Sequence, residues 1–242
     1  MRRSWLIAIL GALLATAPAA GSLSKPLIIG TEPNFPPLSY LEGNRITGFE
    51  IDLIRELAKG MGTTVRLQAV SFTDQPKLLA AGKLDAAISS WTFTPERRKT
   101  LLFSAGYFDA GQAIIVTTAS KIRTRHELKD RIVGVQQATT GEDAAEQHLA
   151  FRELKRYPDI TVAFGELAGG RLAAVVVDLP VALNEVKQRQ GLKIIGGTLT
   201  SERYGIVAAP RQKALIARFD EQLAKIKADG RYSKLYGKWF SR

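Results

Sequence analysis

The sequence predicts an α/β fold, and three observations lead to that prediction. Short β-branched and apolar runs alternate with helix-period patterns along most of the chain, which is typical of layered proteins with largely parallel strands. The 242 residues, 45% of them hydrophobic, suffice for one large domain or two of about 100 residues each. The chain contains no cysteine, so its core forms without disulfides and it has no thiolate metal site.

The first 22 residues have the three-part pattern of a secretory signal. Two arginines precede the apolar run Trp5–Ala15, and the small-residue site Ala17-Pro18-Ala19 follows it. The run is shorter than the roughly 18 apolar residues that a membrane span needs. We therefore expect residues 1–22 to be cleaved and the mature protein to be exported and soluble.

The first part of the mature chain alternates strand and helix patterns. We expect strands at Leu27–Gly30, Thr64–Val70 and Leu84–Ser89. Phe49–Lys59 repeats apolar residues at helical spacing and is followed by Gly60, which favours a helix end. A second helix is expected over Asp74–Ala81. Thr94-Pro95-Glu96 predicts a helix start, because threonine is a good N-cap and proline fits the first helical position.

The remaining chain continues the alternation. The expected strands are Gln112–Thr117, Arg131–Gln136, Ile160–Phe164, Ala173–Asp178, Lys193–Ile195 and Tyr204–Ala209. The expected helices are Thr140–Phe151, Pro180–Gln190, Arg211–Ala228 and a short terminal helix that carries Tyr232, Leu235, Tyr236, Trp239 and Phe240. Thr140 is expected to open the first of these helices, since Asp143 follows three residues later. These elements indicate two compact α/β units.

Five segments carry residue patterns that occur together in one order. They are Gly30–Pro37 with Gly48–Leu53, Gly82–Ser104, Val133–Gly141, Gly170–Asp178 and Asp229–Phe240. The ordered set resembles the family 3 extracellular solute-binding proteins, the amino-acid receptors of ABC importers, over essentially the whole mature chain. The resemblance implies a type II periplasmic-binding-protein fold, in which each of two lobes is a mostly parallel sheet flanked by helices.

The resemblance also implies how the lobes divide the chain. Lobe 1 would comprise residues 23–110 and 202–242, and lobe 2 would be the inserted residues 111–201. Two crossover hinge strands would lie near Phe108–Gln112 and Leu199–Arg203. One ligand would be held in the cleft between the lobes.

Ten positions match the family's ligand site. They are Glu32, Phe35, Phe72, Ser90, Trp91, Thr92, Arg97, Ala138, Thr140 and Asp178. A guanidinium binds a carboxylate through two parallel hydrogen bonds, so we expect Arg97 to hold the ligand carboxylate, with Thr140 at a helix N-terminus as second donor. We expect Asp178, which ends an apolar strand, to pair with the ligand ammonium. The Thr92 hydroxyl and the Ser90 carbonyl would assist it.

The sequence allows other interpretations of several of these candidate ligand-site residues. Phe35, Phe72 and Trp91 would surround the ligand, although Phe72 also fits plain core packing. Asp178 also fits the N-cap of the helix that follows it. Glu32 would favour a polar or cationic ligand side chain, or it would be solvated at the rim of the cleft.

The chain departs from the family pattern at three positions. Ala138 stands where the family usually has glycine, which would alter the approach of the backbone to the ligand. Ala173 replaces a common aspartate, and we expect that change to be structural. Glu50 conservatively replaces a frequent aspartate.

The expected function is capture of a free, polar or basic amino acid and its delivery to an inner-membrane ABC permease. We expect a periplasmic monomer that uses no cofactor. The alternative on the same fold is a periplasmic dehydratase or lyase acting on a small carboxylate, with Glu32 and Asp178 available for acid–base work. No Ser–His–Asp set, phosphate loop or metal-ligand spacing is visible in the sequence.

The formal charge of +11 raises the possibility of a nucleic-acid partner. From Arg203 to Arg242, however, ten Lys and Arg face three Asp and Glu, so this segment alone contributes 10 − 3 = +7. The aromatic residues there have a helical spacing that turns them inward, away from any base-stacking surface. We expect a solvated basic face on the outside of lobe 1 and no nucleic-acid binding.

Overall fold

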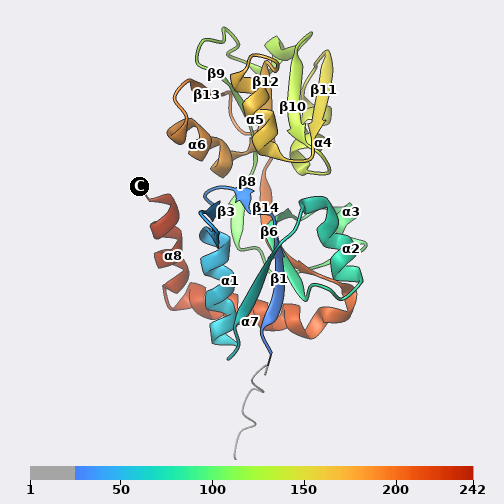
Figure 1. The fold of residues 1–242 in the computed structure, drawn as a ribbon, viewed down its shortest axis with the longest axis vertical. Helices are drawn as coiled ribbons and strands as arrows, with labels where there is room; N and C mark the ends of the chain where they lie inside the picture. The colour runs from blue at the N-terminus through green and yellow to red at the C-terminus, as the bar shows by residue number, and fades with distance from the viewer. Residues whose placement is uncertain (1–24, 242) are drawn as a thin grey trace, which may run out of the picture.

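The computed structural model describes residues 25–241, which form two lobes joined by two connections (Figure 1). The expected signal peptide, residues 1–22, lies outside the described residues. Each lobe contains a sheet with helices packed against it, so the predicted two-lobed α/β fold is confirmed. In the described part of the chain, no helix combines the length and apolar character that a membrane crossing requires.

The first lobe is built on a six-stranded sheet. Its strands are β5 (Val65–Ala69), β1 (Leu27–Thr31), β6 (Ala86–Thr92), β14 (Glu202–Ala208) and β7 (Leu102–Phe103) in spatial order, with β8 (Phe108–Ala110) also on β14. β1 runs parallel to β5 and β6, whereas β14 runs antiparallel to its neighbours. The helices are α1 (Phe49–Gly60), α2 (Gln75–Ala80), α3 (Pro95–Arg98), α7 (Lys213–Ala228) and α8 (Arg231–Phe240). A small sheet of β2 (Asn34–Phe35), β3 (Ser39–Glu42) and β4 (Arg45–Thr47) leads from β1 to α1.

The second lobe is built on a five-stranded sheet. Its strands, in spatial order, are β11 (Glu153–Tyr157), β10 (Ile132–Gln136), β12 (Ala174–Asp178), β9 (Gln112–Thr117) and β13 (Leu192–Ile195). β9 runs antiparallel to both of its neighbours, and the other pairs are parallel. Its helices are α4 (Thr140–His148), α5 (Ile160–Ala168) and α6 (Leu179–Gln188).

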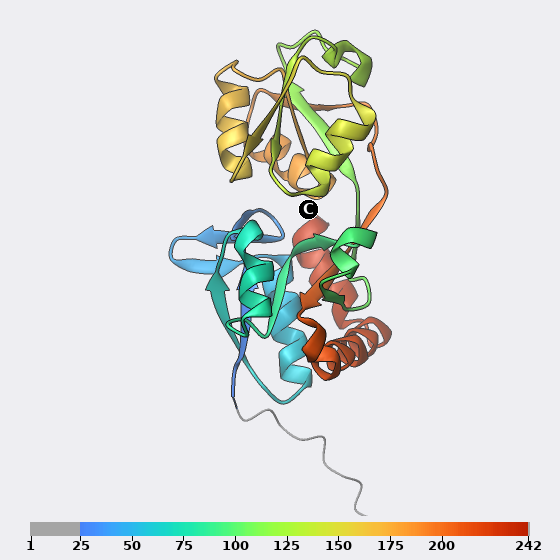
Figure 2. The same ribbon diagram turned by 90° about the vertical axis from the view of Figure 1, so that its right-hand side faces the viewer.

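Two adjacent connections link the lobes (Figure 2). The chain enters the second lobe between β8 and β9 and returns to the first between β13 and β14. β8 and β14 pair antiparallel, with Glu202 opposite Ala110, and the Leu199 amide donates to the Gln112 carbonyl at 2.7 Å. The two crossings are therefore hydrogen-bonded to each other, which is the arrangement of a paired hinge.

The expected strand Ile160–Phe164 is wrong, because this segment is the first part of helix α5. The Asp159 side chain accepts from the Thr161 amide at 2.7 Å and so caps the helix. Apolar side chains at helical spacing, from Ile160 to Leu167, are then buried. The edge strand β11, Glu153–Tyr157, was not expected, since its sequence is mostly polar and charged.

The C-terminal helices pack on the outside of the first lobe, as expected, with α7 and α8 both against α1 (Figure 1). Phe49, the first residue of α1, is fully buried, and its ring centroid lies 5.3 Å from that of Phe240 and 6.0 Å from that of Tyr232. Gly48 precedes it with φ 129°, where a Cβ would lie 2.1 Å from the Leu38 carbonyl oxygen. Only glycine fits this turn, which sets the start of α1 against the sheet.

Candidate functional site

A cavity lies between the two lobes and is lined from both. The space that it encloses, together with space open to solvent, is about 350 Å³. Its lining residues are Glu32, Phe35, Phe72, Ser89, Ser90, Arg97, Gln136, Thr139, Thr140 and Asp178. Seven of the ten residues predicted from the sequence are among them. Trp91, Thr92 and Ala138 are not in the lining, but each contacts a residue that is.

Arg97 is fixed in the first lobe and reaches the second. Helix α3 begins as predicted, since the Thr94 hydroxyl accepts from the Arg97 amide at 3.1 Å. The guanidinium donates to the Thr92 carbonyl and, across the cleft, to the Ala138 carbonyl, both at 3.1 Å. Burial lowers its pKa, against the opposing effect of nearby carboxylates, but a guanidinium keeps its charge in proteins. With five N–H donors, it retains donors for an anion in the cavity.

An aromatic pair forms the floor beneath this guanidinium. The rings of Phe72 and Trp91 stack at 4.2 Å between centroids, and the Arg97 guanidinium carbon lies 5.3 Å and 5.0 Å from them. Trp91 is 3% exposed, and its indole N–H donates to Gln75 at 2.8 Å. Both interpretations of Phe72 are therefore correct, because its side chain packs in the core and also lines the cavity. Trp91 lies one layer behind, where it supports Phe72 and Arg97.

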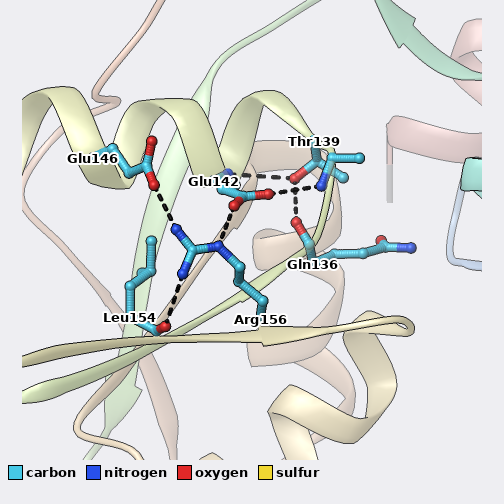
Figure 3. A network of polar contacts seen from close by, with 7 residues as sticks. Gln136, Thr139, Glu142, Glu146, Leu154 and Arg156 are labelled. Carbon is cyan, nitrogen blue, oxygen red and sulfur yellow. Dashed lines mark hydrogen bonds and ion pairs between the residues drawn. The ribbon is translucent and has the colours of Figure 1, made fainter.

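Thr140 does not cap helix α4, contrary to expectation. Thr139 is the N-cap, with its hydroxyl accepting from the Glu142 amide and donating to the Gln136 carbonyl at 2.8 Å (Figure 3). The helix also ends at His148, before the expected Phe151. Because Thr139 satisfies the helix end, the hydroxyl of Thr140 is released for contacts between the lobes.

The loop before α4 is braced by a charged network (Figure 3). Ala138 has φ 61°, which is unusual for a residue with a side chain. Its amide donates to Glu142 at 2.7 Å, and Glu142 in turn forms an ion pair with Arg156, which also pairs with Glu146. The left-handed conformation explains why glycine is usual here. These contacts hold Ala138 in the left-handed conformation, in which its carbonyl accepts a hydrogen bond from Arg97.

Ser90 is the second left-handed residue at the site, with φ 52°. The fully buried Glu50 carboxylate accepts from its amide at 2.7 Å, from its hydroxyl at 3.1 Å, and from the hydroxyl of Tyr107. Burial raises the pKa of Glu50, while these hydrogen bonds lower it. Glu50 thus holds Ser90 in this conformation within β6.

Asp178 ends β12 and is 8% exposed. Asp178 stands at the N-cap position of α6, as the alternative interpretation expected, but its side chain makes no capping hydrogen bond to the helix. The hydroxyl of Tyr204 donates to this side chain instead. Burial, followed by the negative charge of Glu202, raises the pKa of Asp178 to about 7.

Glu32 is held between the lobes and is not a solvated rim residue. Its carboxylate accepts from the Phe72 amide at 3.0 Å and, across the cleft, from the side-chain amide of Gln136 at 2.7 Å. Burial raises the pKa of Glu32, and these two hydrogen bonds oppose that effect. Glu32 and Gln136 thus form a polar contact between the lobes within the cavity lining.

Sequence reasoning missed two side chains that organise the site. Gln136 is the last residue of β10, which is parallel to β12. The rule that ligands bind at the carboxyl ends of parallel strands, applied to Asp178, would also have selected Gln136. Glu202 begins β14 and accepts from the Thr92 and Thr140 hydroxyls at 2.7 and 2.8 Å. No local sequence pattern marks it.

The comparisons with known proteins agree on one family. The family described as "Bacterial extracellular solute-binding proteins, family 3" matches residues 27–242. The ABC transporter arginine-binding protein 1 of Escherichia coli K12 is 30% identical over 239 residues, covering 96% of this chain and 98% of its own.

Two solved structures are similar throughout. The arginine-, lysine-, histidine-binding protein ArtJ of Geobacillus stearothermophilus has a TM-score of 0.86 and 33% identity, with 90% of this chain and 96% of that chain covered. An ancestral arginine-binding protein bound to glutamine has a TM-score of 0.85 and 38% identity, with 90% and 98% covered.

Proposed function

This chain belongs to the bacterial extracellular solute-binding proteins, family 3, and from that premise we propose that it captures a basic amino acid, arginine above all, for an ABC importer. The lobes would close on the ligand, and the closed form would deliver it to a permease in the inner membrane. Among the relatives, an arginine-binding protein of Escherichia coli and an arginine-, lysine-, histidine-binding protein support this choice of ligand.

The observation that carries the proposal is the balance of charge at the cavity. One guanidinium, Arg97, lies there with two carboxyl groups in the lining, Glu32 and Asp178. A third carboxyl group, Glu202, accepts a hydrogen bond from Thr140 of the lining. Buried charges need partners of opposite sign. A ligand with one carboxylate and two cationic groups supplies what this set lacks, and a basic amino acid is such a ligand.

The positions of these groups suggest which part of the ligand each of them binds. Arg97 and the backbone amides at the start of α4 would bind the α-carboxylate. Asp178 and Thr92 would accept from the α-ammonium. Glu32 and Gln136, which are hydrogen-bonded across the cleft, would bind the cationic end of the side chain, for which a guanidinium offers two parallel donors.

The remaining assignments follow from the family and the signal pattern. We propose that residues 1–22 direct export and are removed, that the protein acts in the periplasm as a monomer, and that lobe 2 comprises residues 111–201. A ligand that contacts both lobes binds the closed form better and shifts the equilibrium toward it by that difference in affinity. Arg97, which already spans both lobes, supports such coupling.

A thermal-shift panel of common amino acids on refolded, ligand-free protein tests this function. Arginine at about 100 times its Kd should add about 2.7 kcal/mol to the free energy of unfolding. For a protein of this size that corresponds to a Tm rise of roughly 5–10 °C. We expect a smaller rise with lysine and none with glutamate.

Two results of the panel would count against the proposal. A Tm rise with glutamate equal to that with arginine would contradict the basic specificity, and no rise with any amino acid would contradict the binding function. Mass spectrometry of the recovered ligand provides the control for the dehydratase or lyase alternative. We expect the ligand to be released chemically unchanged.

Affinity for the ligand should fall as pH decreases below about 7. The pKa of Asp178 is raised to about 7, and only its carboxylate form pairs with an ammonium. Below that pH, binding must expel a proton, which weakens affinity by up to about tenfold per pH unit. Calorimetric titrations at about pH 8, 7 and 6, in buffers of different ionisation enthalpy, should show this loss together with proton release. An affinity that is constant over this range would contradict the role of Asp178.

A further inference from the structure

Glu202 lies where the hinge meets the site. It is the first residue of β14 and pairs with Ala110 of β8, so its backbone belongs to the two crossing strands. Its side chain extends to the cleft and accepts hydrogen bonds from side chains of both lobes. The function proposed above gives this carboxylate no direct contact with the ligand.

Three hydroxyls donate to this carboxylate. One oxygen accepts from Thr92 at 2.7 Å and from Thr140 at 2.8 Å. The side-chain nitrogen of Gln112 lies 3.4 Å from this oxygen and donates to the Thr140 hydroxyl at 3.2 Å, which leaves that hydroxyl one further lone pair. The other oxygen accepts from Thr200 at 2.7 Å. Thr92 ends β6 in the first lobe, whereas Thr140 begins α4 in the second. The hinge carboxylate therefore joins one hydroxyl from each lobe.

Each hydroxyl has a single hydrogen, and this fixes what it can offer a ligand. Because Thr92 and Thr140 donate to Glu202, their remaining lone pairs can only accept hydrogen bonds. An ammonium group provides the donors that such acceptors need, while a carboxylate does not. Of the donors expected near Thr140, the backbone amides at the start of α4 therefore remain for the ligand carboxylate, and the Thr140 hydroxyl does not.

We propose that Glu202 is a positioning residue that clasps the two lobes and sets the Thr92 and Thr140 hydroxyls as acceptors for the ligand's α-ammonium. The orienting part of this role rests on the function proposed above, whereas the clasp does not. Separation of the lobes moves Thr92 and Thr140 apart, so it breaks at least one of their hydrogen bonds to Glu202. Glu202 thereby couples closure of the lobes to preparation of the ammonium site.

The clasp can be measured without any ligand. The chain has no cysteine, so Lys77→Cys on α2 and Gln147→Cys on α4, both exposed, provide one spin label on each lobe. Pulsed electron resonance then gives the distance between the lobes. Glu202→Ala should lengthen the mean distance relative to the parent. Asp109→Asn is the matched control, because Asp109 pairs with Arg203 on the same hinge strands but is exposed.

The orienting role is measured with two ligands, arginine and 5-guanidinopentanoic acid, which lacks the α-ammonium. Glu202→Ala should speed dissociation of both ligands, because both bridge the lobes that the clasp holds together. It should speed arginine dissociation about tenfold more than that of the deaminated analogue, as expected for lost hydrogen bonds to a charged group. Thr140→Val should weaken arginine binding in the parent but add little in the Glu202→Ala background, because one interaction is removed in both cases.

The outcomes separate this proposal from the proposed function. Unchanged lobe distances in Glu202→Ala, or the same lengthening in Asp109→Asn, would overturn the clasp, whether or not an amino acid binds. Equal losses for arginine and its deaminated analogue would overturn the orienting role while leaving amino-acid binding intact. If no amino acid binds, a lengthened distance in Glu202→Ala alone still supports the clasp.

Discussion

Arg97→Ala is expected to weaken amino-acid binding by at least about 30-fold while the protein remains folded. The guanidinium is the one cationic side chain in the lining of the cavity as described. Removing one partner of a desolvated charge pair costs roughly 2–5 kcal/mol, which is a loss in affinity of about 30-fold to several thousandfold. Isothermal titration with the amino acid that gives the largest Tm rise measures this loss.

The fold should survive because the floor beneath Arg97 is made by other residues. Phe72 and Trp91 stack on each other, and the Trp91 indole is tied to Gln75. Arg98→Ala is the control: this neighbour on α3 is exposed, lies 4.8 Å from the Phe93 ring, and is absent from the cavity lining. Binding by Arg97→Ala equal to that of Arg98→Ala would remove Arg97 from the site.

The position of Arg97 could be predicted because its signal is local. Thr94 and Pro95 begin a helix by their own chemistry, which places the arginine in its first turn whatever the rest of the chain does. Asp178 was predictable for a similar reason, since an apolar strand leads directly to it. Nearby residues place both side chains on their elements, whereas their assignment to a ligand site came from the family resemblance.

The parts that sequence reasoning missed depend on contacts between distant segments. Glu202 accepts hydrogen bonds from Thr140 and Thr92, which lie 62 and 110 positions away in the sequence. No pattern in the residues around Glu202 predicts these partners. The error at Ile160–Phe164 has another cause. Its β-branched residues suggest a strand, but the cap at Asp159 and the burial of one helical face outweigh that weak preference.

Asp178→Asn is expected to have two large and opposite effects, on binding and on stability. Binding should fall by about a hundredfold or more, because the ligand ammonium loses its charged partner. The ligand-free protein should nevertheless become more stable at about pH 8, by roughly 2 kcal/mol or about 4–8 °C in Tm. Asparagine keeps an oxygen to accept from Tyr204 but carries no charge into the interior.

The dependence of this gain on pH identifies its cause. Asp178 has a folded-state pKa of about 7 against an ordinary value of 3.8, so ionisation disfavours the folded state. That destabilisation is absent below the ordinary value, grows as pH rises toward 7, and is constant above it. The stability difference between Asp178→Asn and the parent should therefore disappear toward pH 4. Asp109→Asn is the control, since Asp109 is exposed and lies outside the cavity lining. A Tm difference between Asp178→Asn and the parent that is independent of pH would show that packing, and not charge, separates the two proteins.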